Sequence, residues 1–175
     1  MNNYELKMEK FSRLVDNVTE ISGNITSWAT SLLVLIVVVD VAARYLFSES
    51  SVALQELEWH LFAFIFLGAA AYTLKQNEHV RVDLFYSKCS ERKKAIINII
   101  GVVLFLLPFT IVTITSSFDF ISASFRFGET SPDPGGLPAR YVIKSLLPLS
   151  FLLILLQGIV IIGKSVKVLT SGDKK

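Results

Sequence analysis

Asp40 and Arg44 place charge deeper within apolar sequence than any other residues of this chain. They stand four positions apart in the apolar run 28–47, so on a helix they share one face and can form an ion pair. Inside a membrane such charges serve a proton or ion relay, or they pair and fix helix packing. A relay needs several ionisable groups along a path, and the other apolar runs offer few at that depth. We therefore expect a structural pair.

A second chemically able group, Glu56, Glu58 and His60, stands at the start of the next apolar run, 57–74. Carboxylates and imidazoles bind metals or accept protons, but the sequence has no second cluster of His, Cys or carboxylates to complete a metal site. The dipole of a helix beginning here also stabilises Glu58. We expect structural roles. One arrangement pairs Glu56 or Glu58 with Arg44, because they lie near the outer ends of adjacent runs.

Other catalytic or cofactor chemistry finds no support in the sequence. His60 and His79 fall at opposite ends of one expected helix, ~28 Å apart at ~1.5 Å per residue, so they cannot share a haem iron. The single cysteine, Cys89, makes neither an internal disulfide nor a metal site. No Ser-His-Asp arrangement is evident, and Gly135-Gly136 follows prolines rather than a strand. The sequence predicts no enzyme, no metal and no cofactor in this chain.

The elements that position these residues are four apolar runs at 28–47, 57–74, 95–118 and 141–163. Each approaches the ~20 residues with which a helix crosses ~30 Å of hydrocarbon. Hydrophobic residues make up 52% of the chain and the mean hydropathy is +0.55, which fits a membrane protein. The predicted fold is all-α: one integral membrane domain, 1–175, with four transmembrane helices.

The placement of Lys and Arg predicts the orientation. Thirteen of these 17 residues lie in 1–23, 75–94 and 164–175, against two in 48–56 and 119–140. By the positive-inside rule both termini and the second loop are cytoplasmic, and loops 48–56 and 119–140 face outward. The formal net charge of only +2 does not favour a nucleic-acid partner.

Further features refine the expected helices. Segment 1–23 is weakly amphipathic and is expected to form a short helix at the cytoplasmic interface, ending at Ser22-Gly23-Asn24. Trp28 and Trp59 are expected interface anchors, and Pro108 is expected to kink the third span. Small residues allow another helix to approach closely, so we expect helix packing at Gly68, Ala69, Ala70 and Ala71.

Several short motifs occur in a characteristic order. They are Arg44-Tyr45-Leu46-Phe47, Glu56-Leu57-Glu58-Trp59, Phe66-Leu67-Gly68-Ala69-Ala70, Asn77-Glu78-His79-Val80-Arg81-Val82-Asp83, and Pro148-Leu149-Ser150-Phe151 leading to Leu156-Gln157. Together, over about residues 28–160, they resemble the small membrane subunit (DctQ-like) of tripartite ATP-independent periplasmic (TRAP) transporters. The cytoplasmic loop residues His79, Arg81 and Asp83 are similar to the family's motif after the second helix.

The resemblance implies a non-catalytic small subunit of a sodium-coupled, binding-protein-dependent secondary importer in a bacterial inner membrane. The implied partners are a large membrane subunit, which would hold the sodium, a periplasmic substrate-binding protein and membrane lipid. The run 131–138, with three prolines and two glycines in 132–138, is similar to members linked with organic acids. The expected substrates are therefore 2-oxo acids, dicarboxylates or sugar acids.

The resemblance also implies that the chain braces the large subunit and that loops 48–56 and 119–140 face the binding protein. The residues expected to dock it are Glu129, Pro132, Asp133, Pro134, Gly135, Gly136, Pro138 and Arg140. The alternative is a self-contained oligomeric four-helix exporter or channel, which would need a polar path lined by ionisable groups. A membrane sensor or anchor without transport is a third class.

Overall fold

The protein consists of long helices joined by short connections. The computed structural model describes residues 3–76, 86 and 89–171, and this part contains no strand. The helices are α1 (Asn3–Phe47), α2 (Val52–Lys75), α4 (Glu91–Gly101), the π-helical turn η1 (Val102–Leu106), α5 (Leu107–Arg126) and α6 (Arg140–Ser171). Because α4, η1 and α5 run on without a break, four helices are long and apolar enough to cross a membrane. The predicted all-α fold with four spans is confirmed.

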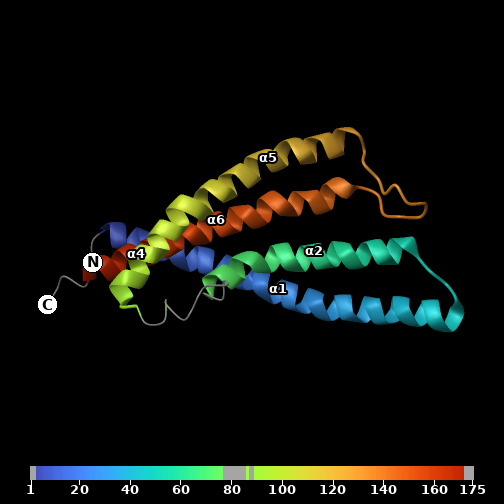
Figure 1. Ribbon diagram of the computed structural model, residues 1–175, viewed down its shortest axis with the longest axis horizontal. Coiled ribbons are helices and arrows are strands. Elements are labelled where there is room, and N and C mark those ends of the chain that lie inside the picture. The colour runs from blue at the N-terminus through green and yellow to red at the C-terminus, as the bar shows by residue number, and fades with distance from the viewer. Residues whose placement is uncertain (1–2, 77–85, 87–88, 172–175) are drawn as a thin grey trace.

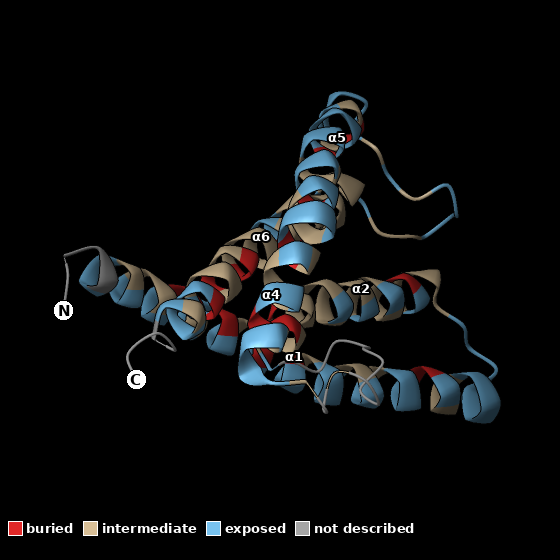
Figure 2. Ribbon diagram, turned by 60° about the vertical axis from the view of Figure 1, so that its left-hand side comes forward, coloured by how far each residue is buried: buried red, intermediate tan, exposed pale blue. Residues whose placement is uncertain are grey.

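The four long helices pack as two hairpins, α1 with α2 and α5 with α6, joined through contacts between α2 and α6. We call the end where α1 begins and α6 finishes the termini end, and the opposite end the loop end. Figure 1 shows the hairpins close together near the termini end, where α4 also lies, and spread apart toward the loop end. Figure 2 shows the same divergence after a turn of 60°.

The first helix differs from the expectation. It runs from Asn3 to Phe47 without a break, so the predicted separate short helix over 1–23 is wrong. The Ser22 hydroxyl donates a hydrogen bond to the Gly68 carbonyl at 2.7 Å, and a Cβ on Gly23 would lie 2.6 Å from the Tyr72 ring. These small residues let α1 approach α2 closely and do not end the helix.

The third span accommodates Pro108 through a change of helix type. Proline lacks the N–H that would bond to the carbonyl four residues earlier. The π turn η1 ends directly before α5, and the Leu107 N–H donates to the Val102 carbonyl five positions back. The wider turn therefore lies where the regular hydrogen-bond ladder would otherwise meet the proline.

The two loops predicted to face outward are shorter in the structure than in the prediction. Ser51 caps α2, its side chain accepting a hydrogen bond from the Leu54 N–H, and such a cap stabilises a helix start five residues earlier than the apolar pattern indicates. The connection between α1 and α2 is therefore 48–51. Helix α5 continues to Arg126, which leaves 127–139 as the connection to α6. As a consequence, Glu56 lies within the second turn of α2.

Few residues of the described chain are buried (Figure 2), and most of those that are buried are polar. Among the described residues the fully buried apolar side chains are Val15, Ala71, Leu74, Ala95, Val102 and Val160. The buried polar ones are more numerous and include Thr19, Thr26, Asp40, Glu56, Thr110, Ser117, Ser124, Ser150, Gln157 and Ser165. Packing and hydrogen bonds, which drive helix association in lipid, therefore hold the described chain together.

Candidate functional site

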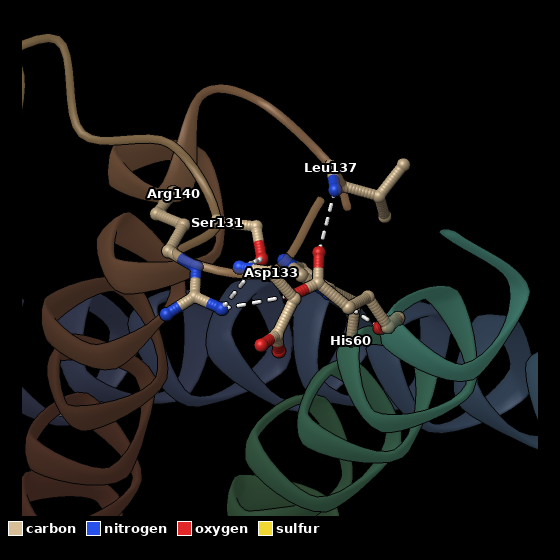
Figure 3. Close-up of polar contacts among 6 residues, drawn as sticks. His60, Ser131, Asp133, Leu137 and Arg140 are labelled. Carbon is tan, nitrogen blue, oxygen red and sulfur yellow. Dashed lines mark hydrogen bonds and ion pairs between the residues drawn. The ribbon is translucent and has the colours of Figure 1, made fainter. Parts of the chain in front are cut away.

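The loop end holds a buried carboxylate with three donors, which we call the Glu56 cluster (Glu56, Ser131, Leu137 and Arg140). Glu56 is 5% exposed. Its Oε1 accepts from the Ser131 hydroxyl at 2.5 Å and from Arg140 Nη2 at 2.8 Å, and its Oε2 accepts from the Leu137 N–H at 2.5 Å. Figure 3 shows Ser131, Leu137 and Arg140 converging from the loop and from the start of α6.

The register of two helices brings the partners together. Helices α2 and α6 run in the same direction with a constant offset: Arg140 meets Glu56 at a separation of 84 residues, and Ser150 donates to the Leu67 carbonyl at a separation of 83. Arg140 is the first residue of α6, so its guanidinium is placed by the helix start. The pairing thus joins the two hairpins as well as the loop.

The loop 127–139 is closed by its own hydrogen bonds. The Ser131 N–H donates to the Leu137 carbonyl at 3.1 Å, the Gly136 N–H to the Asp133 carbonyl at 3.0 Å, and the Arg140 N–H to the Glu129 carbonyl at 3.0 Å. A Cβ on Gly136 would lie 2.8 Å from Glu56 Oε2 and closer still to Ser131. Glycine is therefore required for the loop to press against the carboxylate.

Electrostatics explain why this carboxylate remains paired. A buried charge needs an opposite charge and further hydrogen bonds to offset its lost hydration. Arg140 supplies the charge and also lies over the Trp59 ring, 5.7 Å from its centroid. Nearby, Lys144 forms an ion pair with Glu129, and the Lys144 ammonium holds the pKa of the Glu129 carboxyl below its usual range.

A second polar cluster lies at the termini end. We call it the Asp16 cluster (Asp16, Glu20, Lys75, Gln157 and Lys164). Asp16 Oδ1 accepts from Gln157 Nε2 at 3.2 Å and Oδ2 accepts from Lys164 Nζ at 2.9 Å. Lys75 Nζ donates to the Asp16 carbonyl at 3.1 Å and pairs with Glu20 at 2.8 Å. The cluster joins α1, α2 and α6 directly, because each of its five members lies on one of these helices.

The intramembrane pair has the geometry its spacing predicts. Arg44 Nη2 pairs with Asp40 Oδ2 within α1. Asp40 is 2% exposed, and its Oδ1 has no partner among the described residues. The alternative arrangement, in which Arg44 pairs with Glu56 or Glu58, is wrong: Glu56 pairs with Arg140, and a buried oxygen of Glu58 has no partner in the part of the chain described.

The remaining expected residues are dispersed. Gly68 lies against α1, where a Cβ would come 2.6 Å from Thr26, and Ala71 is buried. Trp28 is 79% exposed and contributes nothing to either cluster. The loop residues His79, Arg81 and Asp83, which were predicted to be cytoplasmic, lie outside the described residues.

Two absences bear on chemistry. Among residues 3–76, 86 and 89–171, no group of three or more His, Cys, Asp or Glu side chains is arranged to hold a metal ion. The Glu56 and Asp16 carboxylates are each occupied by donors from the chain itself. Both clusters therefore act as hydrogen-bonded joints between elements.

The Asp16 cluster was missed in the sequence because none of its members stands out. Its residues are ordinary charges or amides at the borders of apolar runs, up to 148 positions apart. The only available signal was that Lys75 and Gln157 lie at or within the inner ends of such runs. That Lys75 and Gln157 both donate to Asp16 becomes evident only once the helix register is known.

Comparison with protein families gives a match over most of the chain. The family model described as "Tripartite ATP-independent periplasmic transporters, DctQ component" matches residues 33–168. That range contains the Glu56 cluster entirely, together with the α2 and α6 members of the Asp16 cluster. A search of curated proteins finds no match.

Proposed function

The chain belongs to the DctQ family of tripartite ATP-independent periplasmic transporters, and from this premise we propose that it braces the large membrane subunit and presents a prefolded loop to the binding protein. Membership makes it a non-catalytic, multi-pass membrane component of a transporter with a large membrane subunit and a binding protein. We place it in a bacterial inner membrane, in a sodium-coupled importer of organic acids.

The Glu56 cluster is the observation that carries the docking proposal. Its carboxylate fixes the loop 127–139 through Ser131 and Leu137, and fixes the loop to α6 through Arg140. A surface already ordered before binding loses little conformational entropy when a partner docks. In this proposal the loop therefore serves as a rigid platform that exposes Pro132, Asp133 and Pro134.

Exposed apolar surface supports the bracing role. Large apolar side chains are exposed along the first and third spans, for example Leu35 and Val38 on α1, Phe105 on η1 and Phe109 on α5, each at least 59% exposed. Lipid or the transmembrane helices of a large subunit can cover such surface, because neither requires polar groups from it.

The spacing of the two clusters suits a membrane position. Glu56 and Lys75 are 19 residues apart on α2, or ~28 Å at ~1.5 Å per residue, close to the ~30 Å hydrocarbon thickness. In the proposal one cluster lies near each membrane face, where charged groups keep access to water. The helices between them are then held at both ends.

The test is an uptake assay in proteoliposomes that hold the large subunit and this chain, with the binding protein added outside. Glu56→Gln keeps the side-chain size but removes the charge that holds Arg140. We expect the two membrane subunits to copurify as in wild type, and the affinity for binding protein to fall about tenfold, equivalent to ~1.4 kcal/mol. The matched control is Glu58→Gln, two positions away, which should leave docking unchanged.

Different results separate the parts of the proposal. Wild-type docking by Glu56→Gln would refute the platform role. Full uptake by the large subunit and binding protein without this chain would refute the bracing role. Uptake that persists without a sodium gradient would refute the proposed coupling, and transport by this chain alone would favour an exporter or channel.

A further inference from the structure

A groove runs between the first part of α1 and the last part of α6, at the termini end. Its volume is about 540 Å³. We call it the α1–α6 groove. Its walls are mainly apolar, with Met8 from α1 and Ile159, Ile162 and Val166 from α6, and two cations, Lys164 and Lys167, stand among them. The groove lies outside the Glu56 cluster and shares only Lys164 with the Asp16 cluster.

The packing of two helices explains why the groove exists. The Met8 side chain lies where a Cβ on Gly163 would stand, so α1 and α6 approach closely at this point. Val160 is fully buried beneath it. Beyond this contact the helices leave space between apolar side chains, and Val166 remains 44% exposed beside it.

Two lysine ammonium groups line the groove, and they are only partly paired within the described chain. Lys164 and Lys167 are three residues apart and so share a face of α6. Lys164 donates to Asp16, but its side chain is 56% exposed and an ammonium has three N–H donors, so it has donors to spare. The Lys167 side chain has no ion pair or hydrogen bond with any residue in the described part of the chain, and only its backbone carbonyl accepts, from Thr170. The carboxylate at the groove, Glu9, is paired with Arg13 at 3.3 Å.

We propose that the α1–α6 groove binds an anionic phospholipid from the leaflet on the side of the chain termini. The headgroup phosphate accepts hydrogen bonds from Lys164 and Lys167, and the first part of an acyl chain lies against Ile159, Ile162 and Val166. Basic pockets between membrane helices on the cytoplasmic side recognise lipid headgroups in this way. A free phosphate would use the two cations and leave the apolar walls exposed to water, so the mixed lining favours a lipid.

The position of the groove fits this ligand. On α6 the groove residues begin two positions after Gln157, a member of the Asp16 cluster. Lys164 and Lys167 lie about 10–15 Å further along α6 than Gln157, at ~1.5 Å per residue. Helix α6 therefore places Ile159 and Ile162 before the two cations, in the order in which a phospholipid presents acyl chain and phosphate.

Native mass spectrometry of the purified complex with its large subunit tests the proposal. The complex is delipidated in detergent and titrated with phosphatidylglycerol, with phosphatidylcholine or with inorganic phosphate. We expect one phosphatidylglycerol to bind about tenfold more tightly than phosphatidylcholine, and inorganic phosphate at the same concentration not to displace it. Lys167→Gln should remove most of that preference, and Val166→Trp should block binding by filling the groove from its exposed side.

Matched controls keep the test interpretable. Lys10→Gln removes an exposed lysine from α1, and Leu152→Trp adds the same bulk to another exposed position of α6. Both should bind lipid as wild type does. Equal binding by all four variants would overturn the proposal. So would displacement by inorganic phosphate alone, or a photo-crosslinker at Val166 that captures the large subunit and no lipid.

Discussion

The Glu56 and Asp16 clusters both join the two hairpins through a carboxylate, but the elements that supply the hydrogen-bond donors differ. Glu56 is buried and receives two of its three donors from the loop 127–139. Asp16 is half-buried and receives all its donors from helices. At the loop end, the contact between the hairpins is therefore coupled to the conformation of the loop 127–139. At the termini end, the Asp16 cluster joins helices to one another, and no loop among the described residues takes part.

The largest effect is expected from removing the more deeply buried carboxylate. Glu56→Ala leaves the Arg140 guanidinium without its counter-charge and frees the loop, since breaking one side of a buried ion pair is strongly destabilising. We expect the melting temperature of the detergent-solubilised chain to fall by roughly 10 °C. Proteolysis within 127–139 should accelerate at the same time. An equal or larger fall for Asp16→Ala would show that the two joints do not differ as described.

Glycines at the two ends give the next test. In Gly136→Ala the new Cβ meets Ser131 and lies 2.8 Å from Glu56 Oε2, and such overpacking costs about 1–3 kcal/mol of unfolding free energy. In Gly163→Ala the obstacle is the flexible end of Met8, which can rotate away, so the cost should stay below about 1 kcal/mol. Denaturant titration of both variants measures the difference. Equal costs would mean that the loop end yields as readily as the termini end.

Neutralising the half-buried carboxylate is expected to have a smaller effect. Asp16→Asn keeps the side-chain shape and a carbonyl oxygen that can still accept from Gln157 or Lys164. With solvent screening the loss should be about 0.5–1 kcal/mol, and it should shrink as salt is raised from 0.05 to about 0.5 M. The control is Glu9→Gln on the same helix, an exposed carboxylate that pairs with Arg13. A loss that is independent of salt would indicate a dry, buried joint instead.

The smallest expected effect is the pH dependence of stability that comes from the Glu129–Lys144 ion pair. Lys144 lowers the pKa of Glu129 in the folded protein, so this carboxyl binds its proton more weakly folded than unfolded. Its contribution to stability is fully present above the ordinary glutamate pKa and is lost as pH falls through the lower folded value. The melting temperature of wild type should therefore drop more between pH 6 and about pH 3 than that of Glu129→Gln. A larger drop in the variant would give the wrong sign.

The sequence predicted the features that depend on local pattern. Four apolar runs of about the bilayer length specify four spanning helices because lipid satisfies no backbone polar group. The Asp40–Arg44 pair follows from a spacing of four on one helix. Helix ends were predicted less well, because Ser51 extends α2 outward by capping its first turn, a signal that hydrophobicity does not contain.

Joints between distant elements could not be predicted in the same way. The family resemblance put Arg140 in a docking loop, and the order of residues along the chain put Glu56 or Glu58 beside Arg44. Their true pairing spans 84 residues and depends on the parallel register of α2 and α6. Gly23 shows the same limit: it was expected to end a helix, and it marks a close approach to Tyr72 that only the fold reveals.

The π turn at Val102–Leu106 also explains how the buried residues are spaced along the third span. The buried side chains on the strip from α4 to α5 include Ala95, Val102, Thr110, Ser117 and Ser124, spaced by seven residues except for one interval of eight. The longer interval contains the π turn, which holds one residue more per turn than the α-helix. The π turn thus accommodates the one extra residue between Val102 and Thr110, and the buried side chains stay on one side of the helix. Deleting one residue from Val102–Leu106 would make every interval of the strip seven residues, while inserting one into α5 would rotate every later hydroxyl of the strip out of phase.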